Sequence, residues 1–408
     1  MLFKHVFVNK RALVACAFPV SLVLMTNVHA AGAGQGSNAF NPDIGLILNG
    51  TYGQFSHDPA GYAVSGFPLG DGNDPGSQGF TIGESELAIS SNIDPDWYGM
   101  LTYSMAGDGT AGVENAFMQT TSLGHGLTVK GGRFFSGIGY LNEQHSHTWD
   151  FADTSLPYRA LLGTQFGGDG VQVRWLAPTD LFTEVGAEAF NGDAFPAGGG
   201  ANGANKGRGA WTGFVHIGDD VGDSNSWRAG VSYLSAKAAD RETQSSVSPG
   251  MDAFSGSSKV MIADFVWKWA PHGNPYEKNL KLQAEYLRSK NDGEFTPDGG
   301  PGAGIATPYS ATPSGWYVQA AYQFMPRWRV AARHDQLSAS DPGAAFAGTT
   351  LDSQGNTPKR NSVMVDFSNS EFSRLRLQYN RDQSQPVTNN EWFFQYTMSL
   401  GAHGAHIF

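Results

Sequence analysis

Short segments in which apolar and polar residues alternate run along most of the chain. In one of them Trp316, Val318 and Tyr322 occupy one face, while Gln319 and Gln323 occupy the other. A period of two residues is the pattern of a β-strand with different surroundings on its two sides. One such segment is weak evidence, but its repetition predicts an all-β protein. Amphipathic helices with a 3.6-residue spacing are not evident in the sequence.

The alternation predicts an antiparallel transmembrane β-barrel of about sixteen strands, an even number as such barrels require. The predicted strands are 43–55, 79–91, 97–106, 113–122, 127–135, 170–177, 181–190, 209–217, 226–236, 258–269, 279–289, 315–324, 328–338, 360–368, 373–382 and 390–400. Tight turns are expected at 94–96, 124–126, 178–180, 325–327 and 369–372. Longer loops alternate with them at 56–78, 136–169, 191–208, 237–257, 290–314 and 339–359. In outer-membrane barrels the short turns face the periplasm and the long loops face outward.

The segment 136–169 is the longest interval in the middle of the chain without sustained alternation. It carries Trp149, Phe151, Tyr158 and Leu162, which is too much apolar surface for a free linker. Long irregular segments inside compact proteins are usually functional or disordered. We therefore expect this third outward loop to fold into the barrel.

Composition agrees with a barrel rather than with a helical membrane protein. The chain has 53 glycines and 10 tryptophans, yet its mean hydropathy is −0.30. A secreted β-sandwich or β-helix is the alternative all-β reading. Tryptophans at the ends of predicted strands favour the barrel, because aromatic girdles mark membrane interfaces. They are Trp97, Trp175, Trp211, Trp227, Trp269, Trp316, Trp328 and Trp392.

The first thirty residues have the features of an export signal. Basic residues lead into the apolar run 12–25, and a small-residue cleavage site follows at 28–30. We therefore predict a signal peptide at 1–30 and one barrel domain at 31–408. A lipoprotein signal ending before Cys16 is the alternative. Since Cys16 is the single cysteine of the chain, the exported protein is expected to lack disulfides.

Four fragments resemble Gram-negative outer-membrane porins. They are SELAISSNIDPDWYG (85–99), VKGGRFFSGIGYLNEQHSHTWDF (129–151), GDGVQVRWLAPT (168–179) and SLGAHGAHIF (399–408). More narrowly, they resemble the phosphate-selective porin-like group, often labelled zinc-regulated outer-membrane receptors. The resemblance implies a homotrimer, a third loop that narrows the lumen, and insertion into the outer membrane by the barrel-assembly machinery.

The sequence departs from that narrower group in two respects. Phosphate-selective relatives carry a ladder of basic lumen residues, and no such ladder is evident here. Energised receptors carry an N-terminal plug, whereas only 31–42 precedes the first predicted strand. We therefore expect a passive water-filled channel for small polar or ionic solutes. A barrel receptor or transporter for metal ions or metal complexes is the alternative.

The polar faces of the strands supply charged candidates for the pore lining. The basic ones are Arg174, Arg228, Lys268, Lys281, Arg329, Arg333 and Arg376, and the acidic ones are Glu184, Glu188, Asp264, Glu285, Asp335 and Asp366. Opposed charges across a wet pore select ions and polar solutes. The alternative is that many of these residues pair between neighbouring strands, which contributes little at a wet surface. Arg329 and Arg333 form the strongest predicted basic cluster.

A second candidate site lies in the segment 136–169. His145, His147, Asp150 and Asp153 offer imidazole and carboxylate ligands suited to Zn²⁺ if a turn brings them together. The alternative is that they hydrogen-bond the loop to the barrel wall. His403 and His406 near the end of the chain are candidates for a weaker metal site or for a structural or export role.

Other function classes have little support in the sequence. No nucleophile–base motif or phosphate-binding loop is evident, so we expect no enzymatic activity and no obligatory cofactor. An outer-membrane enzyme would require a cluster of catalytic residues at the rim. The formal net charge of −11 argues against nucleic acid as a partner. The expected partners are therefore outer-membrane lipid, small solutes and further copies of the chain.

Overall fold

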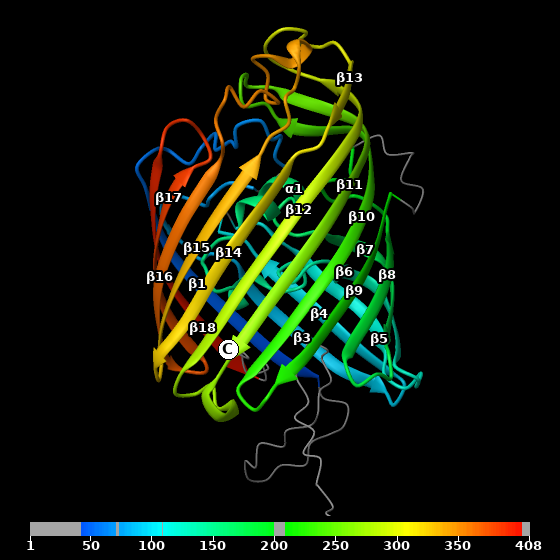
Figure 1. Cartoon of the computed structure of the whole chain (residues 1–408), viewed down its shortest axis with the longest axis vertical. Coiled ribbons are helices and arrows are strands. Elements are labelled where there is room, and N and C mark those ends of the chain that lie inside the picture. The colour runs from blue at the N-terminus through cyan, green and yellow to red at the C-terminus, as the bar shows by residue number, and fades with distance from the viewer. Residues whose placement is uncertain (1–41, 71–72, 108, 200–208, 402–408) are drawn as a thin grey trace, which may run out of the picture. The chain divides into compact units, whose positions relative to one another are not determined.

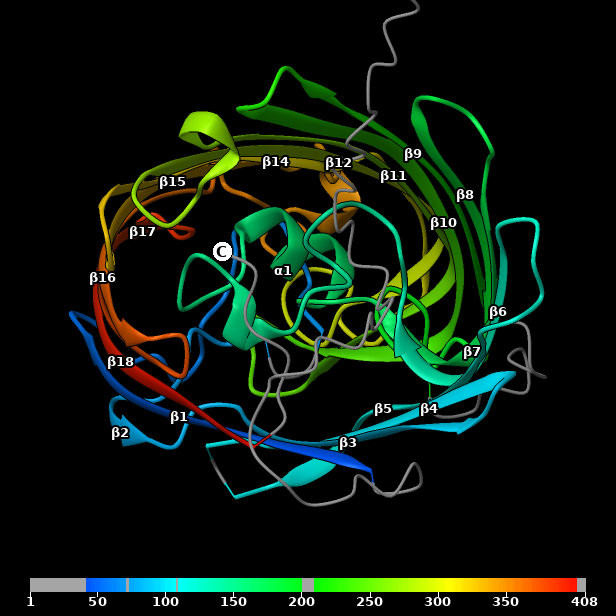
Figure 2. The ribbon, with the colours of Figure 1, turned by 90° about the horizontal axis from the view of Figure 1, so that it is seen from below.

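The computed structural model describes residues 42–70, 73–107, 109–199 and 209–401. In this part of the chain the strands form one antiparallel sheet that closes on itself (Figure 1). The first strand pairs with the last strand on one side and with the 85–94 strand on the other, which completes the ring (Figure 2). The predicted signal peptide and the histidines of the tail lie outside the described residues.

The sheet has eighteen strand segments, of which two are short extensions. They are β1 (Asp43–Phe55), β2 (Gly79–Thr81), β3 (Ser85–Asp94), β4 (Trp97–Met105), β5 (Ala111–Thr120), β6 (Leu127–Phe135), β7 (Gly167–Leu176), β8 (Phe182–Phe190), β9 (Ala210–Val221), β10 (Asn225–Gln244), β11 (Met251–Trp269), β12 (Asn279–Thr296), β13 (Thr307–Ala311), β14 (Ser314–Met325), β15 (Trp328–Ser338), β16 (Lys359–Ser370), β17 (Ser373–Gln383) and β18 (Asn389–Gly401). The helical elements are α1 (Leu156–Leu162) and the 3₁₀ turns η1 (Ser146–Thr148), η3 (Pro271–Gly273) and η4 (Ala344–Phe346). Because β2 and β3 both pair with β1, and β13 and β14 both pair with β12, sixteen strands close the ring.

The predicted all-β barrel is confirmed, and all sixteen predicted strands overlap strands of the structure. Two loop predictions were wrong: much of 237–257 and of 290–314 is strand, because β10, β11 and β12 continue beyond the predicted ends. Burial still alternates there, with Arg241 and Thr243 buried on one face. The outer face in this region carries polar residues such as Glu242, so apolar residues do not occur at every second position and the alternation used to predict strands is absent. These strands therefore extend past the apolar belt as a polar hairpin.

The two faces of the sheet are reversed relative to a water-soluble barrel. In β8 the carboxylates Glu184 and Glu188 are buried inside, whereas Val185 between them is 38% exposed outside. In β12 Glu285 is buried, whereas Tyr286 is 44% exposed. An apolar outer face and a polar inner face are expected of a barrel that contacts lipid. Among the described residues, no helix has the length and apolar character needed to cross a membrane.

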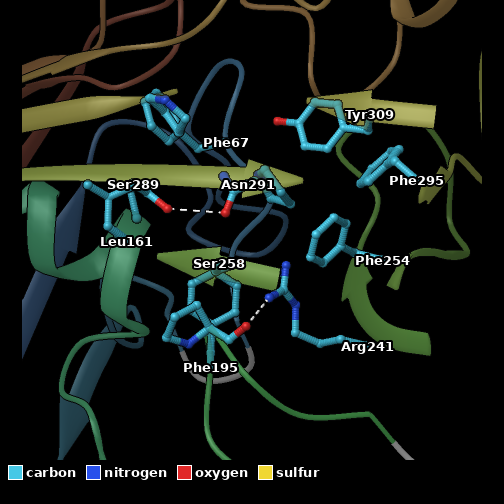
Figure 3. Close-up of a pocket in the computed structure, with 14 residues that line it drawn as sticks. Phe67, Leu161, Phe195, Arg241, Phe254, Ser258, Ser289, Asn291, Phe295 and Tyr309 are labelled. Atoms are coloured by element: carbon cyan, nitrogen blue, oxygen red, sulfur yellow. Dashed lines mark hydrogen bonds between the residues drawn. The ribbon is translucent and has the colours of Figure 1, made fainter. Parts of the chain in front are cut away.

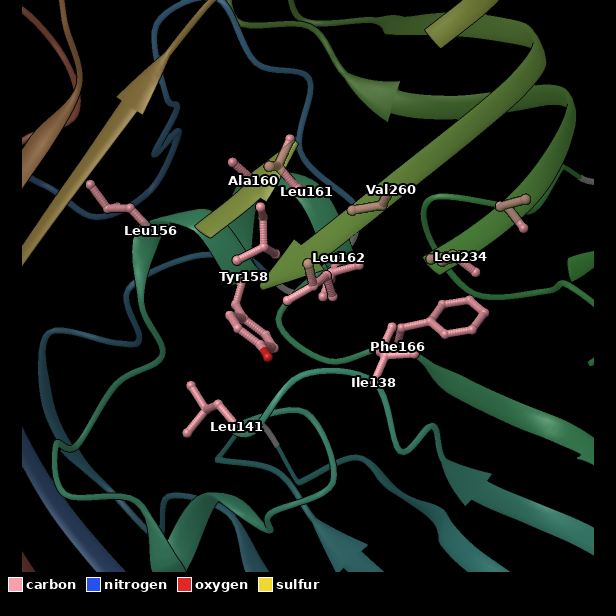
Figure 4. Close-up of a cluster of buried hydrophobic side chains, with 14 of the residues drawn as sticks. Ile138, Leu141, Leu156, Tyr158, Ala160, Leu161, Leu162, Phe166, Leu234 and Val260 are labelled. Carbon is pink, nitrogen blue, oxygen red and sulfur yellow. The ribbon is translucent and has the colours of Figure 1, made fainter. Parts of the chain in front are cut away.

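The segment 136–169, called the inner segment below, contains α1 and packs against the inner face of the sheet. Every residue of α1 is buried, and the helix contacts β12, β14 and β15. Figure 2 shows α1 within the ring of strands. Apolar residues of the segment, including Ile138 and Leu162, belong to one cluster with Leu234 and Val260 of the wall (Figure 4). The helix ends at Gly163, whose φ of 64° is left-handed and favours glycine.

Candidate functional site

All thirteen charged residues predicted for the pore lining occupy the inner face of their strands, by the alternation of burial. Ten of them are buried, while Arg228, Lys268 and Lys281 are half-buried. The ten are Arg174, Glu184, Glu188, Asp264, Glu285, Arg329, Arg333, Asp335, Asp366 and Arg376. Most of the ten contact the inner segment or pair with a residue that does, so they hold the segment as well as line the interior.

Asp150 of the inner segment meets two cations from the barrel wall. Its Oδ2 lies 2.5 Å from Nζ of Lys281, and its Oδ1 accepts a 2.7 Å hydrogen bond from Nη1 of Arg329. The amide of Gln319 donates a further hydrogen bond of 2.8 Å. Arg329 also pairs with Asp366, at 2.8 Å. Burial alone would raise the pKa of Asp150, but Lys281 and Arg329 lower it below its usual range.

Asp153 is held in the same way three residues further on. It lies 2.8 Å from Nη2 of Arg333 and 2.9 Å from Nη1 of Arg360. Both arginines also reach Asp335, at 3.1 and 3.2 Å, and the amide of Asn380 donates a hydrogen bond to Asp153. Burial alone would raise the pKa of Asp153, but Arg360 and Arg333 lower it. Each carboxylate at this end of the segment is therefore neutralised by two cations.

The first part of the inner segment is bound through its backbone by carboxylates of the wall. The amides of Tyr140 and Leu141 donate hydrogen bonds of 3.0 and 3.1 Å to Glu285. The hydroxyl of Tyr158 donates to the same carboxylate at 2.7 Å. On β8, Glu188 accepts a 2.9 Å hydrogen bond from the amide of Gly137. These carboxylates thus accept hydrogen bonds from backbone amides that have no partner in a neighbouring strand.

The four predicted zinc ligands are not brought together. Asp150 and Asp153 are occupied by the cations just described, so they do not face the histidines. His145 and His147 instead lie beside Glu86 of β3, and His145 is also 3.3 Å from Glu114 of β5. Glu86 and Glu114 therefore stand where the two aspartates were expected.

Several inner-face residues that matter here were missed in the sequence. Arg360 and Arg374 both anchor the segment, since Arg360 pairs with Asp153 and Arg374 donates to the carbonyl of His147. Arg360 is an even number of positions from Asp366 in the same strand, and Arg374 is two positions from Arg376. Each therefore lies on the same face as a predicted lumen residue, so the alternation alone could have identified both. Glu114 could not be found in this way, because the register of β4 and β5 shifts beside it.

A pocket lies where the inner segment meets the far ends of β10, β11 and β12 (Figure 3). It encloses about 450 Å³, including space open to solvent. The guanidinium of Arg241 lies 4.4 Å from the ring centroid of Phe195 and 5.0 Å from that of Phe254. Phe67, Phe295 and Tyr309 complete the aromatic lining. Among the described residues no carboxylate pairs with Arg241, so the pocket combines a cation with aromatic walls.

The chain was compared with known proteins. No family model matches it. An uncharacterised protein of Aquifex aeolicus (strain VF5) is 30% identical over 404 residues, which span 91% of this chain and 80% of that protein. The chain belongs to the family of this Aquifex protein. The relative's description assigns no activity to the family.

Solved structures show the fold of the family. OmpT of Vibrio cholerae with its loop L8 deleted has a TM-score of 0.56 at 12% identity, covering 88% of this chain and 99% of that one. The outer membrane channel DcaP of Acinetobacter baumannii has a TM-score of 0.53 at 15% identity, covering 90% and 100%. An anion-selective porin from Comamonas acidovorans has a TM-score of 0.52 at 9% identity, covering 88% and 99%.

Because these identities are low, the structural likeness establishes the fold alone. The fold is a porin-type barrel, and together with the exposed apolar belt it places the protein in the outer membrane. The narrower resemblance to phosphate-selective or zinc-regulated proteins stays a prediction.

Proposed function

We propose that the protein is a passive channel for small polar or ionic solutes, narrowed by the inner segment. The observation that carries this proposal is the inner wall, where charged side chains bind an irregular segment inside a barrel whose outer face is apolar. A segment tied to strands on several sides of the ring would narrow the cross-section of such a channel.

The half-buried residues of the wall indicate where solutes pass. Arg228, Lys268 and Lys281 come from the adjacent strands β10, β11 and β12, and all three are basic. Tyr140 of the inner segment lies over this strip, 5.3 Å from the guanidinium of Arg228 and 5.8 Å from Nζ of Lys281. Arg241 of the aromatic pocket lies further along β10. A row of cations beside the restriction favours anions over cations as permeant solutes, and one neighbour of the same fold is an anion-selective porin.

The proposal is tested by single-channel conductance in planar bilayers. The residues after 30 contain no cysteine, so a single introduced thiol reports on one position. We expect Lys268→Cys to respond to charged thiol reagents: a negatively charged adduct lowers anion selectivity, and a positively charged adduct restores it. Val171→Cys is the matched control, because Val171 is 57% exposed on the outer face.

Two outcomes would contradict the proposal. One is a barrel that inserts into the bilayer but carries no ohmic current. The other is an equal response of Lys268→Cys and Val171→Cys to the same reagent. Deletion of 143–157 provides a second measurement: conductance should rise, because this deletion removes Asp150 and Asp153, and with them the contacts to β12, β15 and β16.

We also propose that the channel is a homotrimer. A trimer form of OmpT is among the structures of the same fold, and porin-type barrels present a broad apolar outer face for such packing. Native mass spectrometry of the detergent-extracted protein should give the mass of three chains. A monomer at every detergent concentration that keeps the barrel folded would contradict this proposal.

Metal uptake is a second candidate function, favoured by one observation. Glu86, His145 and His147 place potential ligand atoms within 4.8 Å of one another. A receptor would have to release bound metal to the periplasm, so zinc transport into liposomes should saturate at low concentration and compete with other divalent cations. A linear dependence on zinc concentration favours the passive channel.

A further inference from the structure

Four potential metal ligands meet where the inner segment touches β3 and β5. Glu86 comes from β3 and Glu114 from β5, while His145 and His147 flank the start of η1. The side chains of Glu86, Glu114 and His147 are 3%, 8% and 3% exposed, and that of His145 is 20% exposed. The cluster is therefore almost closed to solvent, with access along His145.

Three of the four residues, Glu86, His145 and His147, each place one ligand atom within 4.8 Å of the others, and Glu114 lies beside His145. Nδ1 of His145 lies 3.0 Å from Oε2 of Glu86 and 3.3 Å from Oε2 of Glu114. Nδ1 of His147 lies 2.7 Å from Oε1 of Glu86. Four ligands held about 2.0–2.2 Å from a tetrahedral zinc ion are separated from one another by roughly 3.3 Å. Enclosing an ion therefore requires side-chain rotations, above all of Glu114 toward the other three ligands.

Two atoms at the centre of the cluster lack hydrogen bonds. Nδ1 of His145 and Oε2 of Glu114 are both buried, and their mutual contact lacks hydrogen-bond geometry. Buried polar atoms in native proteins are nearly always satisfied, by an ion or water where no protein group serves. The two atoms lie 3.3 Å apart, and a cation beside them could contact both.

The charge of the cluster also suits a divalent cation. Within the described residues the ion pairs of Glu86 and Glu114 are with His145 and His147, and none is with lysine or arginine. Neutral histidines would leave two buried carboxylates uncompensated, which is unfavourable in a nearly dry site. A divalent cation would balance both charges.

A β-bulge aims one of the ligands. Thr102 of β4 pairs with Asn115 of β5, and the next residue, Tyr103, pairs with Val113, so Glu114 is the extra residue. Regular alternation would direct Glu114 outward, because Asn115 faces inward. The bulge lets both side chains reach the interior, which is a common use of bulges beside functional sites.

Asn115 supplies the outer partner that a metal-bound histidine needs. Its side-chain amide lies 3.0 Å from Nε2 of His145, on the side of the ring opposite the cluster. The contacting atom of Asn115 is the amide nitrogen Nδ2, so a metal ion on Nδ1 requires this amide to turn over and present its oxygen to the Nε2–H group. Arg374 fixes the backbone beside the second histidine by donating a 2.7 Å hydrogen bond to the carbonyl of His147.

We propose that Glu86, Glu114, His145 and His147 bind one first-row divalent cation, with Zn²⁺ as the best match to two imidazole and two carboxylate ligands. The bound ion ties the inner segment to β3 and β5. This site goes beyond passive diffusion, and its test measures binding rather than conductance, so the site and the channel stand or fall separately.

The experiment is a titration of the purified, detergent-solubilised protein with Zn²⁺ and Co²⁺. The protein carries His403→Gln and His406→Gln, so that histidines of the tail do not contribute. Isothermal calorimetry with Zn²⁺ should give one site per chain, and Co²⁺ should produce the visible absorption of a low-coordinate N/O site. The double variant His145→Gln/His147→Gln should weaken Zn²⁺ binding by more than about 100-fold, beyond the loss expected from removing an outer partner.

His216→Gln is the matched control, because His216 also contacts a buried glutamate, Glu184, at 3.2 Å, but lacks a second histidine there. Its zinc affinity should equal that of the parent. Glu114→Gln keeps the size of the side chain and should weaken binding while the heat-modifiable barrel remains intact. Unchanged binding in the double variant, or the absence of stoichiometric binding in the parent, would overturn the proposal.

Discussion

Two neighbouring parts of the inner segment, called below the histidine end (145–147) and the aspartate end (150–153), contact the barrel wall with opposite electrostatics. At the aspartate end, Asp150 and Asp153 are each paired with two cations from the strands. At the histidine end, the ion pairs of Glu86 and Glu114 among the described residues are with histidines. The carboxylates at the first end are paired with lysine and arginine, whereas those at the second are paired with histidines alone.

This difference separates a constitutive anchor from a conditional one. Buried ion pairs are costly to form, but removing one partner is costlier still, because a buried charge is left uncompensated. The aspartate end should therefore hold under most conditions. At the histidine end, the attachment of the inner segment to the wall depends on whether a metal ion is bound. Its contribution to stability should therefore change with the metal concentration.

The largest effect is expected at the aspartate end. Asp153→Leu leaves Arg333 and Arg360 to share Asp335, and the free energy of unfolding should fall by about 3–5 kcal/mol. Guanidinium unfolding of the micelle-bound protein measures this loss. Asp341→Ala is the control on the exposed 339–359 connection and should leave the midpoint unchanged. A loss below 1 kcal/mol for Asp153→Leu would remove the distinction between the two ends.

Zinc should act on the other end alone. At a zinc concentration of 100 times its dissociation constant, the free energy of unfolding should rise by about 2.7 kcal/mol through mass action. His145→Arg, which places a permanent cation between Glu86 and Glu114, should abolish this gain. Asp153→Leu should retain it. An equal zinc response in His145→Arg would mean that the ion binds elsewhere.

Acid should leave the aspartate end intact until the pH is low. The folded-state pKa values of Asp150 and Asp153 lie below the usual 3.8. Their ion pairs therefore contribute stability above about pH 3.8 and lose it only as the pH falls through the lowered values. The double variant His145→Gln/His147→Gln removes the histidines as titrating groups. In this variant the rate of amide hydrogen exchange in 150–155, corrected for its intrinsic pH dependence, should be constant from pH 7 to pH 4. A step between pH 5 and 6 would contradict this assignment.

The smallest effect is expected at the rim. Arg133 and Asp169 pair at 2.7 Å, but their side chains are 45% and 46% exposed. Exposed ion pairs contribute little, so Arg133→Gln should lower the free energy of unfolding by less than about 1 kcal/mol. The same guanidinium measurement applies. A loss as large as that of Asp153→Leu would show that the exposure of an ion pair does not predict its contribution to stability here.

The strands and the inner face followed from the sequence because lipid and water impose a strict period of two. The alternation placed all thirteen charged candidates on the inner face. It places Arg360 and Arg374 there as well, although the prediction did not include them. It could not show which of these side chains remain in contact with water. Burial of Glu285 or Arg376 depends on a segment distant in sequence, whose path no local pattern encodes.

The metal candidates show the same limit more sharply. Sequence proximity grouped His145 and His147 with Asp150 and Asp153, but the wall offered the aspartates stronger partners in arginine and lysine. Glu86 lies about sixty positions from the histidines, and its approach depends on tertiary packing. Glu114 is turned inward by a bulge, which breaks the alternation on which the prediction was based.

Closure of the ring between β1 and β18 has a consequence for the order of folding. The seam joins the first and last described strands, and contacts between distant parts of a chain carry the greatest loop-closure entropy. The inner segment is synthesised before β7 and every later strand, including the strands that hold Asp150 and Asp153. The inner segment contacts strands from both halves of the chain, and pairing of β1 with β18 closes the ring around it. Until this seam forms, the ring of strands does not enclose the inner segment on all sides.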